Sequence, residues 1–367
     1  MKKIKLKVNT NSKYAIIIGS GLIGKLSKIL NENSIKFDKC LLVIDNKIPK
    51  FLIKKIIKSL SKKKIIIHLF KANELNKNQT NVNKILEILL KNNFHRNDCL
   101  ISIGGGIVGD VSGFASSIFK RGIKFINVPT TLLAQVDSSI GGKTGINTSS
   151  GKNLIGSFYQ PSIVISDTDF LKTLPKREIV CGYGEILKHS IISNKKFFLF
   201  LNKNASKILN LKSPFIERSI YQSCLIKKKI VEKDEREKKL RKVLNFGHTF
   251  AHAYEASLKY SKKLNHGEAV LIGIMSASKF SLKNNLLSKN EFKLINDHLI
   301  KFKLTMPLNK YFSIKSLKLI ISFMNKDKKN NNNKINLILL KKIGNPILNL
   351  NFNQKKIGYF IKNELIN

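Results

Sequence analysis

The sequence contains no tryptophan, and its 367 residues include no continuous apolar run that approaches the roughly 18 residues needed to cross a membrane. We therefore expect no membrane span and no membrane partner. The N-terminus is basic, but no apolar segment follows it, so we do not expect a signal peptide. We expect a cytoplasmic location. Because 43% of the residues are hydrophobic, the chain can form a sizeable core, and its length predicts about two domains.

Cysteine is also scarce. Cys40, Cys99, Cys181 and Cys224 are widely spaced and form no CxxC pair. This spacing argues against a zinc ribbon or a dithiol redox motif. We expect four reduced and mostly buried thiols, as is usual in cytosolic proteins.

Acidic residues are few. The chain has 23 Asp and Glu against 67 Lys and Arg, which gives a formal net charge of +44. A charge of this size raises the hypothesis of a nucleic-acid partner. However, only six of the basic residues are arginines, whose forked guanidinium is the usual reader of phosphates and bases. Because the lysines are spread along the whole chain, we predict no nucleic-acid partner and place the charge on solvated faces.

The first half of the chain alternates short β-rich runs with helical segments such as 81–92. The β-rich runs are continuous stretches of Ile, Val and Leu, which are typical of parallel strands covered on both faces. This alternation predicts an α/β fold with a Rossmann-like parallel sheet. The predicted strands are 14–21, 39–46, 63–70, 99–106, 124–131 and 162–169.

From about Thr173 the apolar residues recur at helical spacing. We therefore predict an α/β domain at 1–172 and a mostly α-helical domain at 173–367. The Lys/Asn-rich run at 326–334 predicts a loop rather than a binding tail. The predicted helices of the second half are 178–193, 213–235, 246–260, 267–283 and 289–301.

A glycine run, Gly104–Gly106, stands at the end of the predicted strand 99–106 and opens a helix that contains Gly109 and Asp110. Glycines at such a turn let a phosphate approach the backbone, and the helix N-terminus offers N–H donors. Asp110 can accept a hydrogen bond from a ribose or nicotinamide-side group. The spacing differs from the GxGxxG dinucleotide fingerprint, so a tight turn without a ligand is the alternative.

Small, hydroxyl and lysine residues are concentrated in the segment 128–145 and in Gly151-Lys152-Asn153. This composition suits contacts with a polyphosphate and an anionic substrate. A solvated polar loop is the alternative.

Three short glycine-flanked motifs in the helical half contain Glu185, His248 and His266. One carboxylate and two imidazoles form an open site for Zn²⁺ or a similar divalent ion and leave positions for substrate oxygens. His189, four residues after Glu185, can share its helical face and is a rival ligand. Purely structural histidines are the alternative to a metal site.

Together these motifs resemble the 3-dehydroquinate synthase family. The resemblance covers residues 99–273 continuously and the rest of the chain more loosely. The iron-type alcohol and glycerol dehydrogenases share a glycine turn and metal histidines, but they are not known for the segments DSSIGGKT and DEREKKLR. The motifs that carry the resemblance are GGGIVGD, VPTTLLAQVDSSIGGKTGIN, GKNLIGSFYQP, GYGEILKH, DEREKKLRKVLNFGHTFAHAYEA and HGEAV.

The resemblance implies a homodimer with NAD on the α/β domain and one divalent ion, Zn²⁺ or Co²⁺, on the helical domain. The metal ligands would be Glu185, His248 and His266. Ala72-Asn73 replaces the Asp-Gly that is usual in the family. The implied NAD contacts are Asp45, Ala72, Asn73, Glu74, Leu75, Asn76, Lys77, Gly106, Ile107, Val108, Gly109, Asp110, Thr130, Thr131, Lys143, Lys152, Phe170, Leu171, Lys172 and Thr173.

The resemblance also implies that His252, Lys188 and Glu237 take part in catalysis, with His252 as the proton-transfer residue. Arg121 would act across the dimer. The implied substrate contacts are Arg121, Asp137, Asn153, Lys227, Arg241, Asn245 and Lys328 or its neighbour Lys329.

The implied reaction turns 3-deoxy-arabino-heptulosonate 7-phosphate into 3-dehydroquinate and phosphate, a step of aromatic amino-acid biosynthesis. It would proceed by transient oxidation by NAD, phosphate elimination, reduction, ring opening and aldol closure. Cyclases that make an inosose or a valiolone are close rivals, but their substrates lack the carboxylate that Lys227 and Arg241 would bind. Two further hypotheses are a polyol dehydrogenase, which would release NADH, and a nucleic-acid binder.

Overall fold

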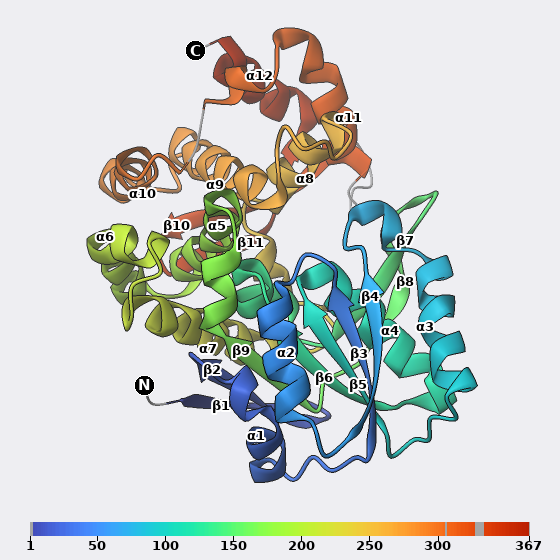
Figure 1. Cartoon of the computed structure of the whole chain (residues 1–367). Helices are drawn as coiled ribbons and strands as arrows, with labels where there is room; N and C mark the ends of the chain where they lie inside the picture. The colour runs from blue at the N-terminus through green and yellow to red at the C-terminus, as the bar shows by residue number, and fades with distance from the viewer. Residues whose placement is uncertain (1–2, 305–306, 327–333, 367) are drawn as a thin grey trace. The chain divides into compact units, whose positions relative to one another are not determined.

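The computed structural model describes residues 3–304, 307–326 and 334–366. It divides into two compact units (Figure 1). Unit 1 contains Met1–Pro175 and Ile220–Arg236, and unit 2 contains Lys176–Ser219 and Glu237–Asn367. The chain therefore leaves unit 1 three residues after the predicted domain boundary at 172/173 and returns to it once, which a single boundary does not describe.

Unit 1 is built on a parallel sheet, as the continuous apolar runs predict. In the described part of the chain, seven strands form this sheet in the order β1-β2-β9-β6-β5-β3-β4. All neighbouring pairs are parallel except β1 and β2. The strands are β1 (Ile4–Asn9), β2 (Lys13–Gly19), β3 (Lys39–Asp45), β4 (Lys64–Phe70), β5 (Cys99–Gly104), β6 (Lys124–Pro129) and β9 (Ile163–Asp167).

Helices cover both faces of this sheet. Leu42 and Ile44 of β3 pack in one core with residues of α1 (Leu26–Glu32) and α2 (Lys50–Ser59). Leu41 and Val43, which alternate with them, pack in a second core with α3 (Gln79–Lys91) and α4 (Gly106–Ile118). Because successive side chains of a strand point to opposite faces, a strand inside this sheet must be apolar at every position. The predicted α/β fold class is confirmed.

The edges of the sheet differ from the sequence prediction. The strand β1, which alternates lysines with buried residues, was not predicted. The strand β4 was predicted as covered on both faces, but it lies at the sheet edge, and Ile67 and Leu69 are exposed. The polar segment after β6 is also not a simple loop, because it contains the antiparallel hairpin β7 (Lys143–Thr148) and β8 (Gly151–Phe158).

Unit 2 is mostly helical, as predicted. It also contains an antiparallel hairpin, β10 (Lys334–Lys342) and β11 (Asn345–Asn353), which the helical spacing did not predict. Buried and less buried positions alternate along β10, so its pattern is that of a strand with one covered face. The helices that complete this half of the chain are α5 (Lys176–Ser193), α6 (Lys195–Leu209), α7 (Phe215–Lys233, mostly in unit 1), α8 (His248–Ser257), α9 (His266–Lys283), α10 (Lys289–Lys301), α11 (Leu317–Lys326) and α12 (Gln354–Ile366).

Among the described residues, no helix combines the length and the apolar character needed to span a bilayer.

Candidate active site

Glycines let three helices of unit 2 approach closely at the predicted metal ligands. Gly247, just before His248, has a φ of +77°, and a Cβ there would lie 2.8 Å from the backbone nitrogen of Ile274. A Cβ at Gly267, just after His266, would lie 2.2 Å from the Cα of Cys181. Both distances are shorter than real Cβ contacts. The glycine flanks of these motifs are therefore needed to bring α5, α8 and α9 together.

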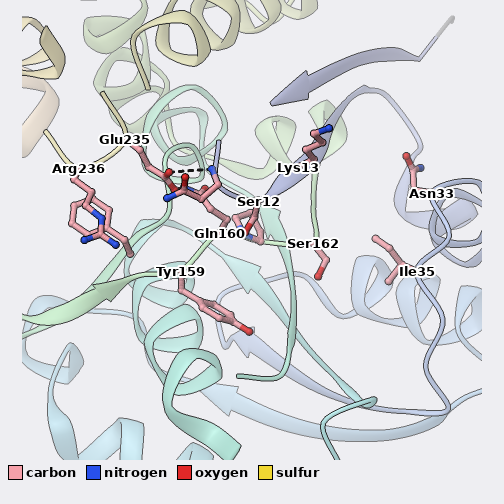
Figure 2. Close-up of a pocket in the computed structure, with 12 residues that line it drawn as sticks. Ser12, Lys13, Asn33, Ile35, Tyr159, Gln160, Ser162, Glu235 and Arg236 are labelled. Carbon is pink, nitrogen blue, oxygen red and sulfur yellow. Dashed lines mark hydrogen bonds between the residues drawn. The ribbon is translucent and has the colours of Figure 1, made fainter. Parts of the chain in front are cut away.

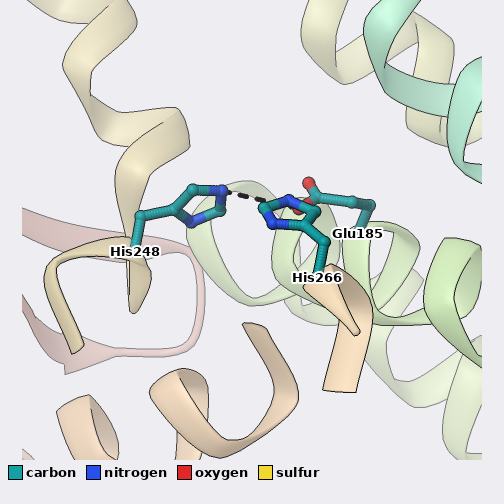
Figure 3. Close-up of side chains that lie close together, drawn as sticks. All are labelled: Glu185, His248 and His266. Carbon is teal, nitrogen blue, oxygen red and sulfur yellow. Dashed lines mark ion pairs between the residues drawn. The ribbon is translucent and has the colours of Figure 1, made fainter. Parts of the chain in front are cut away.

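The three predicted ligands converge in unit 2 (Figure 3). The Oε1 atom of Glu185 lies 3.6 Å from Nε2 of His248 and 3.9 Å from Nε2 of His266. Among the described residues this buried oxygen makes no hydrogen bond. Two ligand atoms on one tetrahedral Zn²⁺ are about 3.4 Å apart, as follows from Zn–N and Zn–O bonds of about 2.0–2.2 Å. The residues therefore fit a divalent ion placed between them.

The outer nitrogens of both histidines face oxygen acceptors. His248 Nδ1 lies 3.3 Å from the carbonyl oxygen of Phe246, and His266 Nδ1 lies 3.2 Å from Oε2 of Glu255. When Nδ1–H donates to such an oxygen, the Nε2 lone pair of the neutral ring is left for a metal ion. Sequence reasoning missed Glu255. A signal was present, because His248, His252 and Glu255 stand at i, i+4 and i+7 of one helix face.

Charged neighbours surround the carboxylate of Glu185. Lys188, one turn along α5, forms a buried ion pair with its Oε2 atom. The rival ligand His189 has its Nε2 atom 3.9 Å from the same Oε2 atom, whereas His248 and His266 face Oε1. The structure thus gathers His248 and His266, rather than His189, at Oε1.

The two histidines among the predicted ligands have opposite pKa shifts. Burial, with smaller contributions from Lys188, His252 and His266, holds the pKa of His248 well below its usual value. Burial also acts to lower the pKa of His266, but the hydrogen bond and charge of Glu255, with the charge of Glu185, outweigh it and raise that pKa. A neutral imidazole is the metal-binding form, so His248 is ready to bind an ion at neutral pH.

The predicted proton-transfer residue His252 lies beside these ligands. Its side chain is exposed, and its ring centroid lies 5.2 Å from that of His248 and 6.2 Å from that of His266. Among the described residues, a ring nitrogen of His252 lies within 4.8 Å of possible ligand atoms of Glu255 and His266. Glu185 does not belong to this group.

In unit 1, many predicted NAD contacts follow the carboxyl ends of parallel strands. Asp45 ends β3, Gly106 begins the helix after β5, and Thr130 follows β6. The strand order reverses between β3 and β5, because β4 lies on one side of β3 and β5 on the other. Dinucleotides bind open α/β sheets at such a switch point. A Cβ at Gly104 would lie 2.5 Å from the side chain of Val108, so the close packing of this turn against α4 requires glycine.

A buried lysine, Lys77, donates hydrogen bonds to two other predicted site residues of unit 1. Lys77 Nζ donates to Asp110 Oδ2 and to Asn153 Oδ1, both at 2.5 Å. Burial raises the pKa of Asp110, although Lys77 opposes this shift. The sequence prediction divided these residues between cofactor and substrate, whereas the structure joins them in one hydrogen-bonded cluster.

The remaining predicted NAD residues of unit 1 lie in three places. The segment Ala72–Lys77 follows β4. In this segment, Oε2 of Glu74 lies 3.5 Å from Nζ of Lys152 in β8. Lys143 begins β7 and is exposed. Phe170–Thr173 follows β9 in a short helical segment, where Phe170 and Leu171 are buried and Lys172 is exposed.

The predicted substrate contacts are found in both units. In unit 1, Lys227 Nζ donates to Oδ1 and to the backbone oxygen of Asp137, both at 2.6 Å. In unit 2, Arg241 is buried and Asn245 donates to Glu237 at 2.8 Å.

Two predicted contacts stand apart from these pairs. Arg121 is exposed and has a left-handed φ of 64°. Lys328 and Lys329 lie outside the described residues, as does most of the predicted Lys/Asn loop.

Unit 1 also has a cavity of about 490 Å³ at the amino ends of β2 and β9. Lys13 and Arg236 are among its charged lining residues, and Glu235 accepts a hydrogen bond from Gln160 at 2.7 Å (Figure 2). No predicted site residue lines this cavity. It is therefore separate from the carboxyl ends of the strands, where the predicted NAD contacts lie.

Comparison with known proteins gives matches over most of the chain. The family model described as 3-dehydroquinate synthase N-terminal matches residues 67–181, and the one described as 3-dehydroquinate synthase C-terminal matches residues 182–330. A 3-dehydroquinate synthase of Pelagibacter ubique (strain HTCC1062) is 66% identical over 366 residues, which cover 100% of both chains. A 3-dehydroquinate synthase of Alkaliphilus metalliredigens (strain QYMF) is 41% identical over 348 residues, 94% of each chain.

Solved structures share the fold. A 2-deoxy-scyllo-inosose synthase complexed with carbaglucose-6-phosphate, NAD⁺ and Co²⁺ matches with a TM-score of 0.89 at 24% identity, covering 98% of this chain and 100% of that one. A 2-epi-5-epi-valiolone synthase from Streptomyces hygroscopicus subsp. jinggangensis 5008, with NAD⁺ and Zn²⁺ bound, matches with a TM-score of 0.85 at 21% identity, covering 98% and 99%. These two likenesses establish the fold alone. The two family models and the 66% identical relative establish more, namely that this chain belongs to the 3-dehydroquinate synthase family.

Proposed function

We propose that this chain converts 3-deoxy-arabino-heptulosonate 7-phosphate into 3-dehydroquinate and phosphate, with NAD and one divalent ion, Zn²⁺ or Co²⁺, as cofactors. The observation that carries the proposal is the convergence of Glu185, His248 and His266 in a chain of this family. When bound, the nicotinamide supplies reversible two-electron oxidation, and the ion polarises substrate oxygens. Because the cofactor is regenerated within one turnover, the enzyme belongs with the phosphate-eliminating carbon–oxygen lyases.

The residues of unit 2 hold the ion and manage protons. Glu185, His248 and His266 would supply three ligands and leave open positions for substrate oxygens. Lys188, buried beside Glu185, offers a fixed positive charge to an anionic substrate. His252 is exposed beside the ligands, so it can exchange protons with solvent and with a bound substrate.

The residues of unit 1 bind NAD and part of the substrate. The glycine turn at Gly104–Gly106 and the α4 N-terminus suit a pyrophosphate. Lys77 would hold Asp110 and Asn153 in a fixed arrangement for the nicotinamide side of the cofactor and for the substrate. Lys227, oriented by Asp137, would bind an anionic group of the substrate.

The substrate class separates this proposal from the other cyclases. Carbaglucose-6-phosphate, bound to the inosose synthase, has no carboxylate, whereas the proposed substrate has both a carboxylate and a phosphate. Arg241, a buried cation of unit 2, suits the additional carboxylate.

One assay tests the function. Purified protein is given the heptulosonate phosphate, catalytic NAD⁺ and Zn²⁺ or Co²⁺, while phosphate release and absorbance at 340 nm are followed together. We expect many equivalents of phosphate per NAD⁺ without net NADH. NADH formed in step with turnover would instead support a dehydrogenase, and no phosphate release would contradict the proposal.

We also propose that the enzyme is a cytoplasmic homodimer. All four cysteines are free and buried, as in proteins of reducing compartments. Leu154 and Phe158, which point to the same face of β8, are 42% and 45% exposed, and a second copy can cover these apolar side chains. Sedimentation should give a dimer mass for the wild type and a shift toward monomer for Leu154→Asp. A wild-type monomer would contradict this proposal.

A further inference from the structure

Glu255 stands behind one of the three proposed ligands. It lies on α8, on the helix face that carries His248 and His252, and only 7% of its surface is exposed. Its Oε2 atom lies 3.2 Å from Nδ1 of His266, at the start of α9. A carboxylate can only accept a hydrogen bond, so Nδ1 carries the proton and donates it.

The two ligand histidines are held to different degrees by packing. The side chain of His248 is 11% exposed, whereas that of His266 is 35% exposed. A histidine ring has two nearly equivalent orientations about its Cβ–Cγ bond, and a half-turn puts a carbon where Nε2 stood. Packing therefore restricts the ring of His266 less than that of His248.

The backbone of His266 is already fixed. Asn265 caps α9 in a capping box with Glu268, and Arg177 binds both carboxylate oxygens of Glu268 at 2.6 Å. These contacts do not fix the orientation of the His266 ring. The hydrogen bond to Glu255 selects one orientation, the one with Nε2 toward Glu185.

We propose that Glu255 is a positioning residue that orients His266 for metal binding. This inference rests on the proposed function, because it assumes that His266 binds the ion. A different assignment, in which His252, Glu255 and His266 hold an ion of their own, would make Glu255 a ligand rather than a hydrogen-bond acceptor. Counting the bound metal ions distinguishes the two assignments.

The test compares Glu255→Ala, Glu255→Gln and the wild type in Zn²⁺ affinity, by chelator competition, and in the visible spectrum of bound Co²⁺. Glu255→Ala should weaken Zn²⁺ binding by about 10–100-fold and change the Co²⁺ spectrum. Glu255→Gln should lose less, because its amide oxygen still accepts from Nδ1–H. This graded rescue separates ring orientation from a general loss of folding.

Glu291→Gln is the matched control. Glu291 is also a mostly buried glutamate of unit 2, where it pairs with Lys195 and accepts from the backbone of Ile343. Its variant should keep wild-type Zn²⁺ affinity. Equal affinity in Glu255→Ala and the wild type, or equal loss in Glu291→Gln, would overturn the inference while the proposed function stands.

Two further outcomes of the same measurement are decisive. Two metal equivalents in the wild type and one in Glu255→Ala would make Glu255 a ligand and overturn its positioning role. A wild type that binds no Zn²⁺ would contradict the proposed function itself and this inference with it.

Discussion

His248 and His252 stand one helical turn apart on α8, and their roles differ through what each ring faces. His248 is buried with Nε2 toward Glu185, whereas His252 is exposed. In some zinc helices both histidines of such a pair bind metal. Among the described residues, Glu185 and His266 form a set of three with His248, whereas His252 forms one with Glu255 and His266.

We therefore expect His248→Ala to lose bound metal, with activity at most partly restored by excess Zn²⁺ or Co²⁺. His252→Ala should keep near-stoichiometric metal but turn over about 10²–10⁴-fold more slowly, the usual span for a removed acid–base group. Metal analysis of both purified variants checks this. Equal metal loss in the two would show that the role given to His252 is wrong.

His298 of α10 is fully buried. Its Nε2 atom lies 3.0 Å from the hydroxyl of Tyr183, and its Nδ1 atom lies 3.1 Å from Oδ1 of Asn202. Burial, with a smaller effect of Lys301, lowers its pKa from 6.5 to about 4. Between these values the unfolded chain binds more protons than the folded one. The free energy of unfolding is therefore not reduced by His298 above pH 6.5. It decreases as the pH falls from 6.5 toward 4.

At pH 5 this loss should amount to about 2 kcal/mol of unfolding free energy. His298→Asn cannot titrate in this range, so its unfolding free energy should fall less between pH 7 and pH 5 than that of the wild type. Denaturant unfolding at the two pH values measures the difference. Parallel losses in both proteins would mean that His298 does not control the acid sensitivity.

At the scale of elements, the entry into α8 decides where His248 stands. Gly247 has a left-handed backbone, and its neighbours in α9 leave no room for a Cβ. Gly247→Ala should destabilise the protein by about 1–3 kcal/mol from backbone strain alone, and more from the collision. It should also weaken Zn²⁺ binding, because α8 and α9 must separate.

Gly358→Ala is the control within the same unit. Gly358 lies in α12, where a Cβ would meet nothing within 4 Å, so alanine should stabilise by up to about 1 kcal/mol. Thermal unfolding and chelator competition on both variants check the pair. If Gly247→Ala and Gly358→Ala changed stability and Zn²⁺ affinity equally, close packing at Gly247 would not be what positions the predicted ligand His248.

The whole molecule has a net charge of +44, which could be mistaken for evidence of a nucleic-acid-binding protein. Lysine dominates it and is dispersed along the chain, so we expect DNA binding to be weak, indifferent to sequence and steeply reduced by salt. Gel shifts with two unrelated duplexes over a series of salt concentrations measure this. Sequence-selective binding that survives physiological salt would contradict it.

Much of the fold and site followed from the sequence by itself. The continuous apolar runs determined the parallel strands, since a strand covered on both faces is apolar at every position. The glycine-flanked motifs singled out Glu185, His248 and His266 before any distance was known. The hairpin β10–β11 was not predicted, because its half-buried strands differ from the fully apolar runs of the parallel sheet and are stabilised by pairing with each other.

Only the tertiary structure decided which groups meet. The pairing of Glu255 with His266, the cluster around Lys77, and the placement of His248 and His266 rather than His189 at Oε1 of Glu185 all join residues that are separated along the chain. Sequence periodicity specifies which face of a helix or strand is apolar. It does not specify which atoms of two packed elements come within hydrogen-bond or metal-binding distance, because that depends on how closely their backbones approach, and here glycines set that approach.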